Sequence, residues 1–454
     1  MHYIKALCLL SVWGMQIGGV QAQSDEFVYE RGKLFNAASS YRMPEVLKLS
    51  ICSADILYET NAPVCQSTLS YQVELPAYMR GVFFSRDSRD GDHQWPNNTN
   101  RLLPWSFDRL QDITSIDYPG IPSNAGPSCL GDALLMTLPD GKFLFLKALS
   151  GDNSLSWFRV NDDGTLNLFL STLGTDALPL TAPLLLLSSG KTVYETLGRA
   201  YYKLTENIEV ASLNKREDKK FFESFDYLGW CTWEHYHFDI DESKILRDLD
   251  TIESTGLPIR YVLIDDGHLS NRNRQLSSFV PDKKRFPNGW RNILARKKDT
   301  GIKWFGLWYA LSGYWEGLSP ENDLPKGVRK KLYDAGRCLL PGPDSCSIGA
   351  FYQYYVQSLK DYGFDFLKVD NQSYTLPLYM GGKEAVRRAR LCNEALEWHT
   401  NREQVGLMNC MAHNVINTDH TRFSNVTRVS IDYKKYDMNM AKSHLFQSYT
   451  NTLL

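Results

Sequence analysis

Carboxylates stand at several points in this chain where their spacing could support chemistry. Asp265 and Asp266 follow an apolar run as an adjacent pair and precede Gly267. Neighbouring residues of a strand point to opposite faces, so both can serve one ligand only where the strand ends and the backbone turns, which a glycine permits. The pair could accept hydrogen bonds from the hydroxyl groups of a polyol, bind a metal ion or cap a helix. All three interpretations stay open from the residues alone.

A further carboxylate lies two residues after a lysine. Lys368 and Asp370 end the apolar run that starts at Phe364. Residues two apart on a strand face the same side, so the ammonium and the carboxylate should be neighbours. A nearby positive charge keeps a carboxylate ionised, which is the state that a nucleophile needs. A buried structural ion pair is the alternative.

The last candidate carboxylate is Asp432, four residues after Arg428. Two carboxylates across a pocket are the equipment of glycoside hydrolysis, in which one attacks the anomeric carbon and the other protonates the leaving oxygen. Asp370 and Asp432 are therefore the predicted catalytic pair. The indoles of Trp230 and Trp233 could stack on the apolar face of a sugar, with core packing as the alternative.

The elements that must position these residues follow residue 222. Apolar strands there alternate with helical segments, which indicates βα units around a parallel sheet. Six strands are predicted: Tyr227–Cys231, Tyr261–Ile264, Trp304–Trp308, Phe364–Val369, Val405–Asn409 and Thr427–Ser430. Each runs into polar or aromatic residues, as strands of a (β/α)8 barrel do where its loops build an active site. The count predicts a barrel that is incomplete at its C-terminal end, and such an open sheet should fold poorly and show little activity alone.

The N-terminal half has a different pattern. Short apolar runs separated by turns such as Pro139-Asp140-Gly141 predict an antiparallel β-sandwich. The spacing becomes helical over Tyr194–Thr205, and the charged run Lys215–Lys220 predicts a linker. The predicted organisation is thus multidomain, with a sandwich over residues 23–215 and a catalytic barrel over residues 222–454.

Residues 1–22 predict export. Lys5, the apolar run Ala6–Trp13 and the small-residue ending Val20-Gln21-Ala22 are typical of a signal peptide cleaved after Ala22. No later stretch reaches the roughly 20 apolar residues of a membrane helix, so we expect a periplasmic or secreted protein without a membrane anchor.

An oxidising compartment would permit disulfides. Cys52 with Cys65, and Cys338 with Cys346, could each close a short loop. Free buried thiols are the alternative. The cysteines form no C-x-x-C pair, so neither a structural metal nor a cofactor is predicted.

Composition narrows the classes of partner. The chain has 454 residues, of which 43% are hydrophobic and 22% charged, which excludes disorder and small disulfide scaffolds. Fifty basic and 52 acidic residues give a formal net charge of -2, so no electrostatic footprint for nucleic acid or anionic membrane is present. An uncharged partner is expected.

Five motifs in one order resemble the raffinose synthase, seed imbibition protein and α-galactosidase family of glycoside hydrolases. They are Gly229–Trp233, Ile264–Gly267, Trp308–Trp315, Lys368–Asp370 and Cys410–Asn414. The resemblance implies a retaining mechanism on a (β/α)8 barrel, preceded by a β-sandwich. It also implies a glycosidase whose substrate is a neutral oligosaccharide that contains α-galactose, of the raffinose type.

The resemblance also implies residue roles. Asp370 matches the nucleophile and Asp432 the acid/base. Asp265 and Asp266 would hold the 4- and 6-hydroxyls of galactose, Lys368 the 3- and 4-hydroxyls, and Arg428 the 2-hydroxyl. Trp230 would line the sugar site. The predicted substrate-binding set is Trp230, Trp233, Asp265, Asp266, Trp308, Lys368, Cys410 and Arg428.

The chain departs from the family at Ile431, where plant members commonly carry the first of two aspartates. Plant members are also longer cytosolic transferases, so the export signal favours hydrolysis. The alternatives are a galactosyl transferase of the raffinose-synthase type, an inactive sugar-binding fragment, and a metal-dependent amidohydrolase whose ligands would include His235, His237 and His413.

Overall fold

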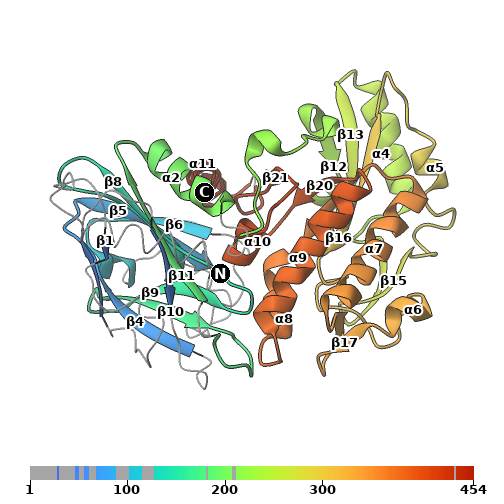
Figure 1. The fold of residues 1–454 in the computed structure, drawn as a ribbon. Helices are drawn as coiled ribbons and strands as arrows, with labels where there is room; N and C mark the ends of the chain where they lie inside the picture. Colours follow the sequence, from blue (N-terminus) through green and yellow to red (C-terminus); the bar gives the residue numbers. More distant parts are fainter. Residues whose placement is uncertain are drawn as a thin grey trace.

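The structure is a computed structural model of the chain. It describes residues 28–29, 46–50, 56–60, 68–87, 102–114, 127–179, 182–206, 211–433 and 436–454. The predicted signal peptide, Cys52 and Cys65 lie outside the described residues. Figure 1 shows a β-rich part, coloured blue to green, beside a part in which strands alternate with helices, coloured green to red.

The N-terminal part is one network of strands in the order β1-β2-β4-β10-β9-β7-β8-β11-β3, with β5 on β7 and β6 on β5. The bounds are β1 Val28–Tyr29, β2 Val46–Ser50, β3 Ile56–Thr60, β4 Thr68–Glu74, β5 Arg80–Asp87, β6 Leu102–Phe107, β7 Pro127–Thr137, β8 Phe143–Ala148, β9 Leu155–Val160, β10 Leu166–Ser171 and β11 Ala182–Gly190. A 3₁₀ turn, η1, spans Leu110–Thr114. The pairings are antiparallel except for β2 with β4.

Strand β7 joins two halves of this network. It pairs with β9 through Gly131 and with β8 from Ala133 onward. Alternation along β8 then separates two cores: Leu144 lies in the larger core, whereas Phe145 lies in a smaller one on the other face. The antiparallel pairing of these strands confirms the antiparallel character that the sequence predicts.

Helix α2, Val193–Thr205, covers the smaller core. Its buried residues Leu197, Ala200 and Leu204 recur every three or four positions, which places them on one face. Thr192 caps the helix by accepting a hydrogen bond from the backbone N–H of Glu195. The helix that the spacing predicts over residues 194–205 is confirmed.

The C-terminal part is built on six parallel strands in sequential order, β12-β13-β16-β19-β20-β21. Their bounds are β12 Leu228–Cys231, β13 Ile259–Ile264, β16 Trp304–Ala310, β19 Phe366–Asp370, β20 Gly406–Asn409 and β21 Val426–Thr427. All six predicted strands are thus present, shifted by a few residues at their ends. Within the described residues β12 pairs only with β13, and β21 only with β20, so the sheet is open.

Helices and two hairpins connect these strands (Figure 1). The helices are α3 Trp233–Tyr236, α4 Glu242–Ser254, α5 Arg291–Leu294, α6 Lys326–Arg329, α7 Ser345–Tyr362, α8 Thr375–Tyr379, α9 Ala385–Arg402, α10 Val415–Asp419 and α11 Met438–Asn451. The hairpins are β14 Leu269–Arg272 with β15 Gln275–Pro281, and β17 Leu332–Asp334 with β18 Leu339–Pro341. The 3₁₀ turns are η2 Arg216–Asp218, η3 Glu223–Asp226 and η4 Gln372–Tyr374.

Helix α7 is tied to the sheet by buried tyrosines. Tyr352 and Tyr355 donate hydrogen bonds to the carbonyl oxygens of Leu311 and Ala310, at the C-terminal end of β16. Such hydrogen bonds satisfy both phenols in the core. None of the helices in the described residues is long and apolar enough to cross a membrane.

Of the two alternatives for Cys338 and Cys346, the structure shows free thiols rather than a disulfide. Cys338 is buried beside the β17–β18 hairpin, whereas Cys346 is exposed in the first turn of α7. The spacing of the two cysteines in the sequence would permit a disulfide, but one thiol is buried and the other is exposed.

A buried ion pair joins the two parts of the chain. Lys147 of β8 lies 2.6 Å from Asp419 of α10, and the side chains are 5% and 0% exposed. Next to it, Ser150 and His420 are hydrogen-bonded over 3.1 Å. The segment after β20 is therefore fixed against the N-terminal part.

Replacement of Lys147 tests this contact. Lys147→Met leaves the Asp419 carboxylate buried without its partner, so we expect the free energy of unfolding to fall by about 3–5 kcal/mol, as measured by urea denaturation. Lys244→Met, which removes the surface ion pair with Asp239, should lower the free energy of unfolding far less. Equal losses in the two variants would contradict the prediction.

Candidate active site

Asp370 ends β19 and is the centre of the candidate site. Its Oδ2 accepts a hydrogen bond from Trp308 Nε1 at 3.1 Å, and its Oδ1 accepts one from the backbone N–H of Asn371 at 2.8 Å. Burial would raise the pKa of Asp370, but Lys368, Arg428 and these hydrogen bonds outweigh burial and hold it below its usual value. The side chain is 10% exposed, so an ionised carboxylate reaches the surface of the site.

Lys368 lies between two carboxylates. Its Nζ is 2.6 Å from Asp265 Oδ2 and 4.0 Å from Asp370 Oδ2, which confirms that Lys368 and Asp370 share a face. Cys231 donates its thiol to the same oxygen of Asp265 at 3.3 Å. Burial would lower the pKa of Lys368, but the carboxylates outweigh burial and raise the pKa well above its usual value. The carboxylates around Lys368 therefore favour its charged form.

Asp266 is enclosed by three donors. Its Oδ1 accepts hydrogen bonds from Tyr314 Oη at 2.9 Å and from the backbone N–H of Gly267 at 2.7 Å, and its Oδ2 accepts one from Trp315 Nε1 at 2.6 Å. Burial raises the pKa of Asp266 to about 6. Gly267 has a φ of 119°, which lets the backbone turn after the two aspartates as the sequence predicts.

The structure excludes one interpretation of the aspartate pair. Strand β14 follows Gly267, so Asp265 and Asp266 do not cap a helix. Asp265 pairs with Lys368, and Asp266 with Tyr314 and Trp315, so both carboxylates already have donors.

Arg428 holds Asp432 near the same end of the sheet as Asp370. Arg428 forms an ion pair with Asp432, and its backbone N–H donates to Asn409 O at the end of β20 over 2.9 Å. The two side chains are 30% and 35% exposed. The charge of Arg428 also lowers the pKa of Asp370, so this arginine interacts with both predicted catalytic carboxylates.

The predicted residues fall into an accessible and a covered set. Those with accessible surface are Trp230, Trp233, Lys368, Arg428 and Asp432, with Asp370 at the margin. Those almost fully covered are Asp265, Asp266, Trp308 and Cys410, at 0–1% exposure. Covered residues support accessible ones: Asp265 holds Lys368, and Trp308 holds Asp370.

This division bears on which predicted residues are placed for direct contact with a sugar. Asp266 and Trp308 have no exposed surface, so in this structure neither is placed to touch a sugar directly. The reason is that Tyr314 and Trp315, from the loop after β16, cover Asp266, while Trp308 packs between Tyr314 and Trp315. Cys410 is likewise buried beside Asp370, and its burial raises the pKa of its thiol.

Two tryptophans, Trp230 in β12 and Trp233 at the start of α3, have aromatic neighbours at the edge of the site. Trp230 packs edge to face with His235, and Trp233 with Phe238. Both indoles keep partial exposure. Their position is compatible with stacking on a sugar and equally with local packing.

Sequence reasoning left out Tyr314, Trp315, Asn371 and Arg274. The first two stand inside the motif Trp308–Trp315 and could have been selected for their donors, and Asn371 follows Asp370 directly. Arg274 lies in the β14–β15 hairpin, outside every motif, and no spacing signal indicates it.

The histidines of the amidohydrolase alternative do not converge. His235 lies 3.3 Å from Asp248, His237 packs on Trp233, and His413 accepts a hydrogen bond from the backbone N–H of Leu102 at 3.4 Å. In the part of the chain that the structure describes, no group of three or more His, Cys, Asp or Glu side chains is placed to hold a metal ion.

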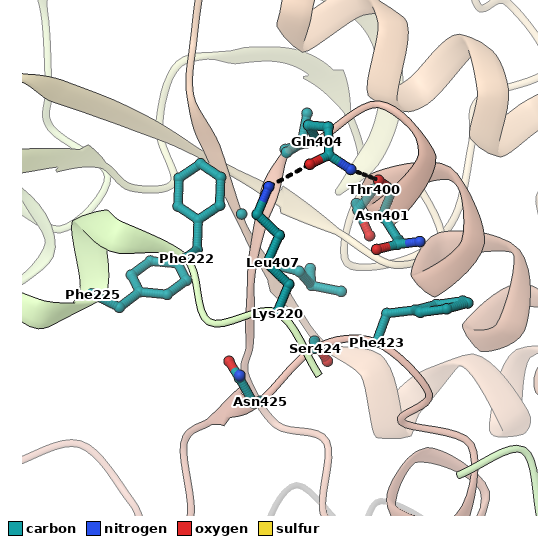
Figure 2. Close-up of a pocket in the computed structure, with 12 residues that line it drawn as sticks. Lys220, Phe222, Phe225, Thr400, Asn401, Gln404, Leu407, Phe423, Ser424 and Asn425 are labelled. Carbon is teal, nitrogen blue, oxygen red and sulfur yellow. Dashed lines mark hydrogen bonds between the residues drawn. The ribbon is translucent and has the colours of Figure 1, made fainter. Parts of the chain in front are cut away.

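Two cavities lie away from these carboxylates. Figure 2 shows a pocket of about 40 Å³ where Lys220 donates to Gln404 beside Phe222, at the N-terminal end of β20; it has room for water but not for a sugar. A larger cavity, of about 540 Å³, lies between α2 and the β21–α11 region. Thr427 and Val429 line it, on either side of Arg428 in the sequence.

Three of the sequence matches to known proteins illustrate what this chain is similar to. The model of the family described as raffinose synthase or seed imbibition protein Sip1 matches residues 183–278. "Probable galactinol--sucrose galactosyltransferase 6" of Arabidopsis thaliana is 26% identical over 334 residues, which are 65% of this chain and 44% of that protein. An α-galactosidase of Saccharomyces mikatae is 32% identical over 104 residues, which are 21% of this chain and 22% of that protein. The resemblance to this family is thereby confirmed.

Solved structures show the same fold. TtGalA, an α-galactosidase from Thermus thermophilus in complex with stachyose, superposes with a TM-score of 0.53 at 16% identity over 88% of this chain and 86% of that one. AgaA, a GH36 α-galactosidase from Geobacillus stearothermophilus, gives a TM-score of 0.51 at 15% identity over 85% of this chain and 53% of that one. The chain spans less than half the length of its first plant relatives, at 44% and 42%.

The raised pKa of Asp266 predicts a pH dependence of stability. The folded state binds this proton more tightly than the unfolded state, because the pKa rises from 3.8 to about 6, so folding is favoured as pH falls. We expect the stability advantage of wild type over Asp266→Asn to grow by about 2 kcal/mol between pH 7 and pH 4.5, as measured by urea denaturation at both pH values.

Asp241→Asn is the matched control of opposite sign. Burial would raise the pKa of Asp241, but hydrogen bonds from Ser243 and Lys244 outweigh burial and lower it. The advantage of wild type over Asp241→Asn should therefore shrink as pH falls. The same trend in both variants would contradict the prediction.

Proposed function

We propose that this chain carries the nucleophile and galactosyl site of a retaining glycoside hydrolase that acts on α-galactosides. The observation that supports this most directly is the environment of Asp370, a partly exposed carboxylate with a lowered pKa at the end of a parallel strand, beside Lys368 and Trp308. A nucleophile must be ionised and reachable. The lowered pKa of Asp370 favours the ionised form, and 10% of its side-chain surface is exposed. The α-galactosidase and galactosyltransferase relatives support the substrate class.

The proposed reaction has two steps. Asp370 attacks the anomeric carbon of the galactosyl group, and the bond to the leaving oxygen breaks while Asp432 donates a proton to that oxygen. Asp432 then takes a proton from water, whose oxygen attacks the anomeric carbon and releases Asp370. Lys368 and Arg428 would bind ring hydroxyls, since both are accessible donors beside Asp370.

Galactosyl transfer is the second candidate function. Transfer uses the same glycosyl-enzyme intermediate, with a sugar hydroxyl in place of water. Two relatives favour it: they match 65% and 60% of this chain, and both are named as probable galactinol–sucrose galactosyltransferases. Product analysis with and without added sucrose separates the two functions.

We also propose a complete (β/α)8 barrel as the architecture of the functional protein. Six parallel strands in sequential order are the arrangement from which such a barrel is built. The fold shared with TtGalA and AgaA supports this proposal.

Export remains part of the proposed function. Residues 1–22 support it by their composition alone. N-terminal sequencing of the protein recovered outside the cytoplasm should begin at Gln23, whereas a retained Met1 would refute export by this segment.

Substitution of Asp370 tests the nucleophile. Asp370→Ala should lower kcat on 4-nitrophenyl α-galactoside by roughly 10³-fold or more, since no covalent intermediate can form. Added azide should restore turnover and give a β-galactosyl azide, because azide attacks from the vacated side. Cleavage that is undiminished in Asp370→Ala would refute the assignment.

Substitution of Asp432 gives a different signature. Asp432→Ala should lower kcat/KM on stachyose by roughly 10²–10⁴-fold, because the poor leaving group needs a proton. The loss on 4-nitrophenyl α-galactoside should be at least tenfold smaller, since nitrophenolate leaves unprotonated. Equal losses on the two substrates would exclude Asp432 as the acid.

A further inference from the structure

The β14–β15 hairpin carries an arginine where its turn favours glycine. Arg272 pairs with Gln275, so Asn273 and Arg274 form a two-residue turn, with φ values of 52° and 60°. Positive φ at both central positions is typical of a type I′ turn, in which Asn-Gly is the preferred pair. A bulky side chain at positive φ is strained. The strain at Arg274 suggests that its side chain is kept for another reason.

The Arg274 side chain lies over an indole and stays exposed. Its guanidinium carbon is 5.1 Å from the centroid of the Trp315 ring. Within the described residues Arg274 makes no ion pair, whereas its neighbour Arg272 pairs with Glu321 and Arg285 donates to the carbonyl oxygens of Phe238 and Gly267. The N–H donors of Arg274 are therefore available to a ligand.

Trp315 connects this arginine to the candidate active site. Its indole N–H donates to Asp266, and its carbonyl oxygen accepts from Asn371 Nδ2 at 3.0 Å. The backbone N–H of Asn371 in turn donates to Asp370 Oδ1. The turn is fixed to the same loop, because Glu316 N–H donates to Arg274 O at 2.9 Å. A short chain of contacts thus leads from Arg274 to the reacting carboxylate.

We propose that Arg274 determines specificity by donating hydrogen bonds to hydroxyl groups of the sugar unit attached to the galactosyl group. This inference rests on the proposed α-galactoside function. A guanidinium is planar and presents its donors in a fixed fork, which suits two neighbouring hydroxyls. Stacking on Trp315 orients the fork before the substrate arrives. Trp315 is the positioning residue for this contact.

Arg274→Gly separates the role of the side chain from that of the turn. Glycine relieves the positive φ, so we expect a Tm no lower than that of wild type. Loss of charged hydrogen bonds should lower kcat/KM on stachyose by roughly tenfold. Methyl α-galactoside ends at the methyl group, so its kcat/KM should change less than about twofold, as measured by galactose release.

Two variants serve as controls. Arg272→Ala removes the neighbouring exposed arginine of the same hairpin and should leave the ratio of the two kcat/KM values unchanged. Arg274→Lys keeps the charge but lacks the planar fork, so it should lower the ratio as Arg274→Gly does.

Each outcome decides between the hypotheses. An unchanged ratio in Arg274→Gly or Arg274→Lys, with an active wild type, overturns this inference and leaves the proposed function standing. If the wild-type protein cleaves neither substrate and shows no binding of stachyose in calorimetry, the proposed function and this inference are both overturned. A lowered ratio in both Arg274 variants but not in Arg272→Ala supports the inference.

Discussion

The candidate site depends on one largely buried cation. Lys368 is 13% exposed and contacts Asp265 directly, with Asp370 at the edge of ion-pair distance. A charge removed from water is tolerated only when partners of opposite charge and hydrogen bonds replace the solvent. The contacts therefore depend on the register of three neighbouring strands. Asp265 follows β13, Lys368 and Asp370 lie on β19, and β16 pairs with both strands between them. A shift of one residue in β19 would turn Lys368, together with Asp370, away from Asp265.

Around this cation the structure uses covered residues to hold accessible ones. Trp308 and the backbone N–H of Asn371 donate to Asp370, so two of its acceptor positions are fixed before any ligand binds. Fixed donors of this kind cost no reorganisation during a reaction. The covered residues contribute orientation and charge rather than contact with a ligand. Substitution of a covered residue would therefore alter the reactivity of Asp370, whereas substitution of an accessible residue would alter the affinity for a ligand.

The sequence predicted what depends on local pattern. Apolar runs that end in polar residues located all six parallel strands, and a spacing of two placed Lys368 and Asp370 on one face. It failed where distant segments meet. Asp266 is covered by Tyr314 and Trp315, which follow another strand, and nothing near Asp266 in the sequence shows this. Arg274 belongs to a hairpin inserted between two βα units, so strand patterning gives it no role.

The ion pair between Lys147 and Asp419 bears on how such a protein can be divided. Asp419 ends α10, the helix that follows Cys410 and β20, so the N-terminal strands support the segment that leaves the candidate site. The two parts are then not independent modules. A C-terminal part expressed without β8 would keep the Asp419 carboxylate without its cation. Another β-rich part could replace the N-terminal strands only if it placed a cation at the position of Lys147.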